Sequence, residues 1–441
     1  MKLLYADPSD LYAVYLRHPR VSIDSRRVAA GGLFVALRGQ SDGNQYAAGA
    51  LEAGAAYAIV DNPDVVAAGD DRYLLVEDSL VALQEIALRH RSAFRMPVFA
   101  ITGSNGKTTT KELIAAVMGR QYRVHATPGN YNNHIGLPLT ILSMPEGTEF
   151  LILEMGANHQ GEIAELCRIG RPTHGLITNI GEAHLEGFGG REGVKRGKGE
   201  LYDWLEKVSG VAFVNTDELD LEEMSDALPR RIPYFVSEEP SPTVAGLEVK
   251  SLAVHPFIEV AFLDEQRQLV QTSTQLAGVH NLQNVKSAVA VGKYFKVPGA
   301  SIAAALAEYR PANHRSQWME HRGVTFYWDA YNANPSSVTA ALAGFATDNE
   351  PLDSVVILGE MLELGAASPA AHRRVVLRAG QVARTVLLVG AEMEDVAREF
   401  DRPHFVDSRL LAEWFWAQDW SGKRIFVKGS RGNRLERLLD E

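Results

Sequence analysis

The stretch Val98-Phe99-Ala100-Ile101-Thr102-Gly103-Ser104-Asn105-Gly106-Lys107-Thr108-Thr109-Thr110 decides the fold of this chain. Its four leading apolar residues predict a buried strand, and residues 111–120 beyond it have the apolar spacing of a helix. A small, glycine-containing turn between a strand and a helix gathers free backbone N–H groups at the positive end of the helix dipole, where an anion binds. The sequence therefore predicts a phosphate-binding loop.

The loop is a short form of the standard phosphate-binding pattern. Ile101 stands where that pattern has its first glycine, so the chain matches only Gly103-x-x-Gly106-Lys107-Thr108. In such a loop Lys107 supplies a point charge for the outer phosphates, and the Thr108 hydroxyl is placed to bind magnesium. A glycine-rich connection without a ligand is the alternative. The strand before the loop and the helix after it favour a nucleotide site.

The composition is that of an ordinary globular protein, with 46% apolar and 22% charged residues. No run of about 18 apolar residues predicts a membrane span. The net charge of −11 argues against non-specific nucleic-acid binding, which needs a basic surface, although a local pocket can still be positive. Cys167 is the only cysteine, and the N-terminal residues turn polar too soon for a signal peptide. We therefore expect a cytoplasmic protein.

The length of 441 residues corresponds to about three domains. Strand and helix signals alternate over residues 1–94, and a proline then opens the strand before the phosphate loop. We expect an N-terminal domain over 1–94, a central nucleotide-binding domain over 95–311 and a C-terminal domain over 312–441. Alternating strands and helices predict the α/β class, with a central parallel sheet and a doubly wound, Rossmann-like C-terminal domain.

Polar side chains follow the predicted strands of the central domain. Glu154 ends the apolar strand 150–153, which is where a metal-holding or water-orienting acid belongs beside a phosphate loop, the alternative being a helix cap. Asn132 and Asn133 lie in an amide-rich segment that suits a polar ligand, although asparagines also stabilise turns locally.

Two further groups of polar residues can each be interpreted in more than one way. His184 lies in a glycine-rich loop beyond a strand, but Mg²⁺ prefers oxygen, so a histidine ligand needs independent support. By charge alone, Lys195, Lys198 and Glu200 predict a solvated helix face.

Three arginines cluster near predicted strand ends, at 25–27 and at Arg38. They are either solvated surface or an anion clamp for a phosphorylated substrate, because the planar guanidinium suits phosphate.

Taken in order, these motifs resemble the Mur ligases, the ATP-dependent amide-forming enzymes of peptidoglycan precursor assembly. The resemblance rests on residues 102–109, 154–157, 179–184, 280–281 and 329–335. It covers nearly the whole chain and is weakest over 205–275 and 390–422. Within the family, residues 184–189, 329–336 and 427–431 look like those of the member that adds D-alanyl-D-alanine. The Asp-Asn-Pro-Arg signature of the relative that adds diaminopimelate or lysine is absent.

The resemblance implies a three-domain Mur ligase architecture and a reaction. ATP would phosphorylate the carboxylate of UDP-N-acetylmuramoyl-tripeptide, bound by the N-terminal domain. The amine of D-alanyl-D-alanine, bound by the C-terminal domain, would attack the acyl phosphate and give the pentapeptide, ADP and phosphate. We expect small-molecule partners only and a monomer that is open without ligands. The alternatives are another Mur-type ligase, a folylpolyglutamate synthetase or, from a different class, a phosphate-loop ATPase switch.

The resemblance also implies a catalytic and metal-binding set. Thr108 and Glu154 would hold one Mg²⁺, and His184 would bind a second. Lys198 would be carbamylated, because a free lysine has a pKa of about 10.4 and repels a metal, whereas a carbamate is an anion. Lys195 is the alternative carrier, and Lys107 completes the catalytic set.

The remaining expected contacts are grouped by ligand. The nucleotide contacts are Gly103, Ser104, Asn105, Gly106, Lys107, Thr108 and Thr109 in the loop, Asn281 and Asn284 on the adenine side, Arg315 at a phosphate and Asp329 at the ribose. The substrate contacts are Ser25 and Arg38 at the uridine-diphosphate end, Asn132 and Asn133, and Tyr331, Asn334, Ser336 and Arg431 facing the dipeptide.

Overall fold

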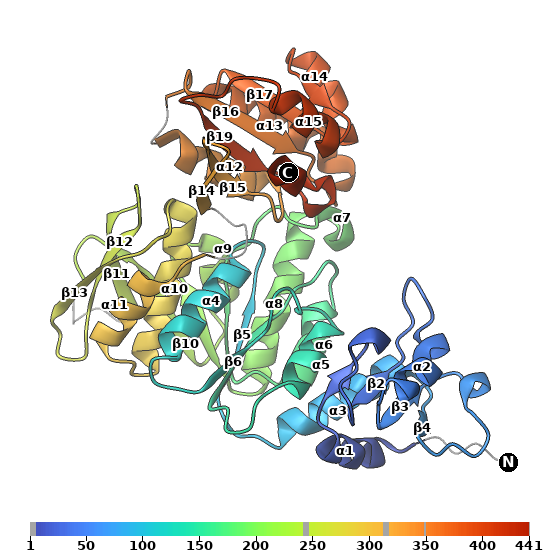
Figure 1. The fold of residues 1–441 in the computed structure, drawn as a ribbon. Coiled ribbons are helices and arrows are strands. Elements are labelled where there is room, and N and C mark those ends of the chain that lie inside the picture. Colours follow the sequence, from blue (N-terminus) through green and yellow to red (C-terminus); the bar gives the residue numbers. More distant parts are fainter. Residues whose placement is uncertain (1–5, 241–246, 312–316, 348–349, 441) are drawn as a thin grey trace.

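The computed structural model describes residues 6–240, 247–311, 317–347 and 350–440. Figure 1 shows three α/β units, each built on a sheet of its own, with the N-terminal unit at lower right and the C-terminal unit at the top. The predicted α/β class is therefore confirmed. The domain limits expected near 94 and 311 stay predictions, and the second lies beside 312–316, outside the described residues. No helix within the described ranges is long and apolar enough to cross a bilayer.

The N-terminal unit has a parallel sheet in the order β1-β2-β3-β4. Its strands are β1 (Val21–Ser22), β2 (Leu33–Val35), β3 (Tyr57–Val60) and β4 (Tyr73–Leu75). Its helices are α1 (Pro8–Arg17), α2 (Ala47–Glu52) and α3 (Ser79–Ser92), with 3-10 turns η1 (Ser25–Arg27), η2 (Gly43–Tyr46) and η3 (Pro63–Val65). The Asp78 carboxylate starts α3 by accepting bonds from the N–H groups of Leu80 and Val81 at 2.7 and 2.9 Å.

The central unit has a nine-stranded sheet in the order β13-β12-β11-β10-β9-β8-β5-β7-β6, parallel except where β12 pairs with β11 and β13. Its strands are β5 (Val98–Thr102), β6 (Val124–Ala126), β7 (Phe150–Glu154), β8 (His174–Ile177), β9 (Val211–Asn215), β10 (Arg231–Ser237), β11 (Leu247–Ala253), β12 (Glu259–Leu263) and β13 (Leu269–Ser273). Its helices are α4 (Lys107–Met118), α5 (Gly136–Leu142), α6 (Glu162–Gly170), α7 (Leu185–Phe188), α8 (Arg191–Lys207), α9 (Leu219–Met224), α10 (Val279–Tyr294) and α11 (Gly299–Glu308).

Strand β5 sets the position of the candidate site. All of its residues are buried, and it pairs in parallel with β7 and β8, placing Ile101 opposite Glu154 and Thr102 opposite Ile177. The carboxyl ends of three parallel strands therefore meet at one edge, so the loops that follow them converge there.

Helix α4 begins at Lys107 and ends at Met118, so the predicted span of 111–120 starts too late. Gly106, with a φ of 79°, turns the backbone directly into the helix. Apolar periodicity cannot show this first turn, because the residues in it are polar. Lys107 and Thr108 consequently lie within the helix and are fixed by it.

The C-terminal unit has a sheet in the order β14-β15-β19-β16-β17-β18, parallel apart from β14. Its strands are β14 (Gln317–His321), β15 (Val324–Asp329), β16 (Ser354–Gly359), β17 (Thr385–Val389), β18 (His404–Phe405) and β19 (Arg424–Lys428). Its helices are α12 (Pro335–Thr347), α13 (Ser368–Val382), α14 (Glu394–Glu399) and α15 (Ser408–Phe415), with 3-10 turns η4 (Gly365–Ala367), η5 (Ala391–Met393), η6 (Arg431–Asn433) and η7 (Leu435–Leu439).

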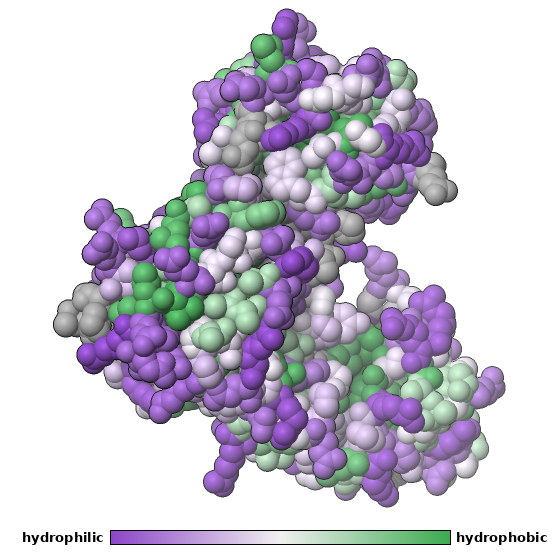
Figure 2. Space-filling view, turned by 60° about the vertical axis from the view of Figure 1, so that its left-hand side comes forward, coloured by the Kyte–Doolittle hydropathy of each residue, from purple (hydrophilic) through white to green (hydrophobic). Residues whose placement is uncertain are grey.

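One apolar core joins the first two units, and the third unit has cores of its own that meet the central unit at partly buried Leu185. One buried cluster contains Leu11 and Ile86 of the N-terminal unit together with Leu137 and Ile163 of the central unit. The C-terminal unit has clusters of its own. Figure 2 shows a notch between the N-terminal and C-terminal units, beside the central one. The N-terminal and central units thus share packing that the C-terminal unit lacks.

Candidate active site

The phosphate loop is tied to the segment that follows β8. The Ser104 hydroxyl accepts a bond from the N–H of Gly181 at 2.9 Å, and the N–H of Asn105 donates to the Asn179 side chain at 3.0 Å. The Thr178 hydroxyl donates to the carbonyl of Asn105 at 2.6 Å. The loop is therefore held in place by its neighbour before any ligand arrives.

Gly103 and Lys107 shape the inside of this loop. Gly103 has a φ of 134°, and a Cβ there would lie 2.0 Å from the Thr178 hydroxyl oxygen, so only glycine fits. The Lys107 ammonium donates to the carbonyls of Gly103 and Ser104 at 2.7 and 3.1 Å. Its charge is thereby held over the loop, while Thr109 is half-buried in the same first turn of the helix.

Glu154 is a buried carboxylate beside the first turn of α4. Its Oε1 atom accepts bonds from the Thr108 hydroxyl at 3.2 Å and from the Asn132 amide at 2.8 Å. Its Oε2 atom accepts no hydrogen bond in the described structure and lies 3.4 Å from the buried Lys111 ammonium. The sequence prediction thus placed Thr108, Asn132 and Glu154 in one site, and the structure brings them together.

These oxygens fit a magnesium ion. Thr108 and Glu154 offer two hard oxygen donors, and Mg²⁺ takes only a few protein ligands alongside phosphate oxygens and water. Within the described ranges, no group of three or more histidine, cysteine, aspartate or glutamate side chains gathers as in an all-protein metal cage. The site therefore suits a metal held jointly by the protein and a nucleotide.

His184 lies in a left-handed conformation with a φ of 55°, and its Nδ1 atom pairs with the Glu363 carboxylate of the C-terminal unit. Burial lowers the pKa of His184, the Glu363 charge opposes this, and the charges of Lys107 and Lys198 lower it further. His184 thus joins the segment after β8 to the C-terminal unit, and its catalytic role stays a prediction.

Lys198 is fully buried in α8, so the prediction of a solvated face is wrong for this residue. Its ammonium donates to the carbonyl of Ala157 at 3.0 Å and lies 4.8 Å from the centre of the Phe188 ring. Burial holds the pKa of Lys198 well below its usual range, and the charge of Lys107 adds to this. The buried site therefore disfavours the ammonium form.

Lys195, one turn earlier on the same helix, has the opposite environment. Its ammonium pairs with Asp220 and Glu223, both at 3.1 Å, and these carboxylates raise its pKa. The nearby Glu200 caps α6 by accepting bonds from the N–H groups of Gly161 and Ala164.

The predicted adenine-side residues are buried against the phosphate-loop helix. Asn284 accepts a bond from the Thr110 hydroxyl at 3.0 Å and donates to Asn281 at 3.0 Å. A Cβ on Gly106 would lie 2.4 Å from the Asn284 side-chain oxygen. This pair therefore packs directly behind the loop.

The C-terminal unit reaches the loop through its predicted dipeptide-facing segment. The Asn334 amide donates to the Asn105 side chain at 2.7 Å, and the Ser336 hydroxyl accepts from the N–H of Glu182 at 3.2 Å. Glu182 also pairs with Arg374. Asn334 thus contacts the phosphate loop, and Ser336 contacts the segment that follows β8, although both are far from these segments in sequence.

Three other predicted residues of this unit lie at the carboxyl ends of β15 and β19. Asp329 is in a buried ion pair with Lys428 at 2.5 Å, so its carboxylate already has a partner. The Arg431 guanidinium lies 5.3 Å from the centre of the Tyr331 ring. Arg315 lies outside the described residues.

The N-terminal predictions are less well joined to the site. Arg38 pairs with Asp61 at 2.9 Å, and Ser25 begins a 3-10 turn, and within the described chain neither shares a hydrogen bond or ion pair with the phosphate loop. Asn133 accepts a bond from the N–H of Gly136 at 2.8 Å and so serves the start of α5. Their contacts with a substrate stay predictions.

Sequence reasoning missed Lys111, Glu363 and Lys428. Lys111 follows Thr108 by one helical turn, so helical spacing could have placed it beside Glu154. Lys428 ends a strand as Glu154 does, which is a usable signal. Glu363 meets His184 only through the contact between units, for which the sequence holds no local pattern.

A phosphate loop with a buried carboxylate at the carboxyl edge of a parallel sheet defines a nucleotide-binding protein, here with two further α/β units. Three family models match it: the Mur ligase family catalytic domain over 19–91, the Mur ligase middle domain over 101–292 and the Mur ligase glutamate ligase domain over 314–431. The UDP-N-acetylmuramoyl-tripeptide–D-alanyl-D-alanine ligase of Bacillus subtilis is 33% identical over 96% of this chain and 92% of its own length. The chain belongs to the Mur ligase family, which confirms the resemblance.

Other relatives agree over nearly the full length. The Escherichia coli ligase of the same name is 33% identical over 95% of this chain and 92% of its own. A crystal structure of MurF from Acinetobacter baumannii matches with a TM-score of 0.86 and 27% identity, covering 99% and 98% of the two chains. MurF from Thermotoga maritima in complex with ADP matches with a TM-score of 0.82 and 27% identity, covering 98% and 97%.

Proposed function

We propose that this protein is an ATP-dependent ligase that joins D-alanyl-D-alanine to UDP-N-acetylmuramoyl-tripeptide. The observation that carries the proposal is the near full-length identity of 33% to relatives named for that activity. The phosphate loop, Thr108 and Glu154 support it, because they form a site suited to ATP with magnesium.

The reaction transfers the γ-phosphoryl group of ATP to the tripeptide carboxylate, releasing ADP. The amine of the dipeptide then attacks the acyl carbon, a proton leaves the nitrogen, and the C–O bond to phosphate breaks to give the amide. Such chemistry depends mainly on positioning and on neutralising anions that crowd together. Lys107 and the loop N–H groups would hold the outer phosphates.

Magnesium, when bound, supplies the positive charge that offsets the phosphates, with Thr108 and Glu154 as its protein ligands. We propose that His184 and carbamylated Lys198 would bind a second Mg²⁺ ion. A neutral Lys198 amine can react with CO₂ and lose a proton to form a carbamate, and its lowered pKa and burial favour that step. Lys195 is held as an ammonium by two carboxylates, so we assign the carbamate to Lys198.

We further propose the roles of the remaining units. The C-terminal unit would hold the dipeptide near Tyr331, Asn334, Ser336 and Arg431, and the N-terminal unit would bind the uridine-diphosphate end. We expect a cytoplasmic monomer with small-molecule partners, because all three substrates are small and polar.

Phosphate release from ATP and magnesium tests the proposal. The full chain is supplied with UDP-N-acetylmuramoyl-tripeptide carrying either lysine or diaminopimelate at position three, with and without D-alanyl-D-alanine. We expect release to need the tripeptide and the dipeptide together, and a pentapeptide product by mass.

The other outcomes separate the alternatives. Equal release from ATP alone would favour an ATPase switch. Product formed with a single amino acid in place of the dipeptide would favour another Mur-type ligase, and product formed with a folate and glutamate would favour a folylpolyglutamate synthetase.

A further inference from the structure

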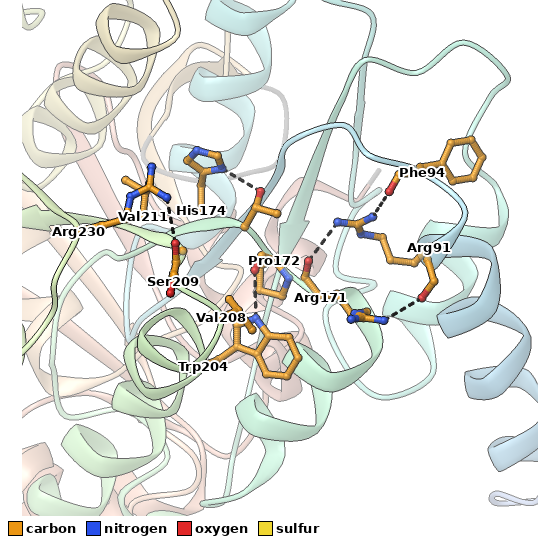
Figure 3. A pocket seen from close by; sticks show the side chains of 13 residues that line it. Arg91, Phe94, Arg171, Pro172, His174, Trp204, Val208, Ser209, Val211 and Arg230 are labelled. Atoms are coloured by element: carbon orange, nitrogen blue, oxygen red, sulfur yellow. Dashed lines mark hydrogen bonds between the residues drawn. The ribbon is translucent and has the colours of Figure 1, made fainter.

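A cavity lies at the amino ends of the central-sheet strands, on the opposite side of the sheet from the carboxyl ends that carry the phosphate loop. It has a volume of about 440 Å³ and is lined where β8 and β9 begin, at His174 and Val211 (Figure 3). The phosphate loop follows the carboxyl end of β5, whereas the cavity lies where β8 and β9 begin. Because these strands are parallel, the two sites lie at opposite ends of the strands. Residues from the ends of α3, α6 and α8 complete its wall, which places it where the N-terminal and central units meet.

The cavity is positively charged on a chain whose net charge is −11. Three arginines line it, Arg91, Arg171 and Arg230, and none of the residues that form its described wall is acidic. The hydrogen bonds of the three arginines go to carbonyl and hydroxyl oxygens, and within the described ranges none of them goes to a carboxylate. Burial and the charge of Arg171 lower the pKa of Arg91 to about 10, which agrees with unbalanced positive charge.

The three arginines differ in how many hydrogen bonds their guanidinium groups already donate within the protein. Arg91 donates to the carbonyls of Phe94, Gly170 and Arg171 at 2.9, 3.0 and 3.1 Å, so it builds the wall and caps the end of α6.

Arg171 donates to the Ser92 hydroxyl at 3.2 Å and Arg230 to the Ser209 carbonyl at 3.0 Å. A guanidinium has five N–H donors. Because both side chains are exposed, each keeps donors available to an anion.

An apolar surface lies between the charged ends. In Figure 3, Trp204 and Pro172 lie between Arg230 on one side and Arg91 with Arg171 on the other. The Trp204 indole N–H donates to the Pro172 carbonyl at 3.0 Å, which fixes the ring. A flat apolar group can pack against such a surface while its charge meets a guanidinium.

We propose that this cavity binds a small organic anion with a flat apolar part, its charged group held by Arg171 or Arg230 and its apolar part packed on Trp204. The hydrogen bonds from Arg91 to Gly170 and from Arg171 to Ser92 cross between the N-terminal and central units. A ligand here therefore stiffens that junction. The inference does not depend on the proposed ligase activity.

Isothermal titration calorimetry on the full chain tests this site, with phenyl phosphate as the probe and benzyl alcohol as its uncharged counterpart. The titration is repeated in Lys107→Ala, which removes the cation of the phosphate loop. A double variant, Arg171→Gln with Arg230→Gln, removes both exposed guanidiniums. Arg378→Gln, a half-buried arginine of the C-terminal unit, is the control.

We expect one phenyl phosphate site that persists in Lys107→Ala and in Arg378→Gln. Because hydrogen bonds to charged groups are stronger than those between neutral groups, the double variant should bind at least about tenfold more weakly. The melting temperature shows whether each variant is folded, and Arg230→Gln alone serves if the double variant is not.

Three results would overturn the inference. They are absence of phenyl phosphate binding, equal affinity in the folded double variant, and loss of binding in Lys107→Ala. Equal binding of benzyl alcohol would also count against it, since the site would then not recognise charge.

Discussion

Two lysines one turn apart on α8 show how strongly the surroundings decide what a side chain can do. Lys198 is buried against Phe188 and donates to the carbonyl of Ala157, whereas Lys195 is paired with Asp220 and Glu223. Burial disfavours the ammonium at the first position, and paired carboxylates stabilise it at the second. The same residue type thus has its ammonium form disfavoured at one position and stabilised at the other.

This contrast gives a matched pair of variants. We expect Lys198→Ala to lower ligase turnover by about a hundredfold or more, because it removes a positioned charged group from the reacting centre. Lys195→Ala should stay within about threefold of the parent, since an exposed ion pair contributes little. Initial rates of phosphate release under saturating substrates measure both. Equal losses in the two variants would contradict the assignment of the carbamate to Lys198.

A half-buried histidine makes stability depend on pH. Burial and the charge of Arg230 lower the pKa of His174 to about 4 from 6.5. Between these values the unfolded chain binds a proton that the folded chain does not, so stability falls as the pH falls through this window.

At pH 5 the loss from this one ring is about 2 kcal/mol. We expect the melting temperature to fall between pH 7 and pH 5, and to fall less in His174→Phe, which cannot take up the proton. Scanning calorimetry at both pH values measures the difference. An identical fall in the parent and the variant would show that His174 is not the group responsible.

At the scale of elements, the phosphate loop depends on close contact with the segment after β8. A methyl group on Gly103 would meet the Thr178 hydroxyl at 2.0 Å, and the φ of 134° is unfavourable for any other residue. The loop can only accept a side chain there by moving away from Thr178 and Asn179, which hold it.

Gly103→Ala should therefore weaken binding of a non-hydrolysable ATP analogue by at least about tenfold, because a displaced loop no longer aims its N–H groups at the phosphates. Gly69→Ala is the control, since Gly69 has a φ of 82° but no atom within 4 Å of its added Cβ. The control should lose about 1 kcal/mol of stability and keep its affinity. Calorimetric titration separates the two, and unchanged affinity in Gly103→Ala would refute the argument.

The elements were predictable from the sequence where the signal is local. Strand β5, the loop after it and the carboxylate at the end of β7 follow from a run of apolar residues ending in glycine or acid. The start of α4 was not predictable in this way, because the residues of its first turn are polar. The burial of Lys198 was not either, since charge patterning cannot show that Phe188 and Ala157 fold over a helix face.

At the scale of the whole molecule, the C-terminal unit is the one free to move. It has its own apolar cores, and it meets the central unit through polar contacts, such as Asn334 with Asn105 and Glu363 with His184, and through partly buried Leu185. Polar contacts between units exchange readily with water. The N-terminal unit, in contrast, shares a core with the central one.

We therefore expect ligands to draw the C-terminal unit in. Small-angle scattering should show a smaller radius of gyration when a non-hydrolysable ATP analogue and the tripeptide substrate are both present. The notch of Figure 2 gives room for this movement. The same radius with and without ligands would rule out closure of this kind.

Contacts between units are the part of the candidate site that the sequence could not supply. The motif around Asn334 was identified, yet its bond to Asn105 joins residues on different sheets, and nothing in either motif specifies the other. Arg38 was expected at a substrate phosphate, but its nearest charge, Asp61, lies on a neighbouring strand end and could not be foreseen from spacing.

The hydrogen bond between Asn334 and Asn105 has one more consequence. It joins a side chain of the nucleotide loop to a side chain of the proposed acceptor site, so occupancy of either site changes the surroundings of the other. Thermodynamic linkage makes such an effect reciprocal. Whatever factor ATP applies to the affinity for the dipeptide, the dipeptide must apply to the affinity for ATP, and this hydrogen bond is one of the contacts through which the two sites are coupled.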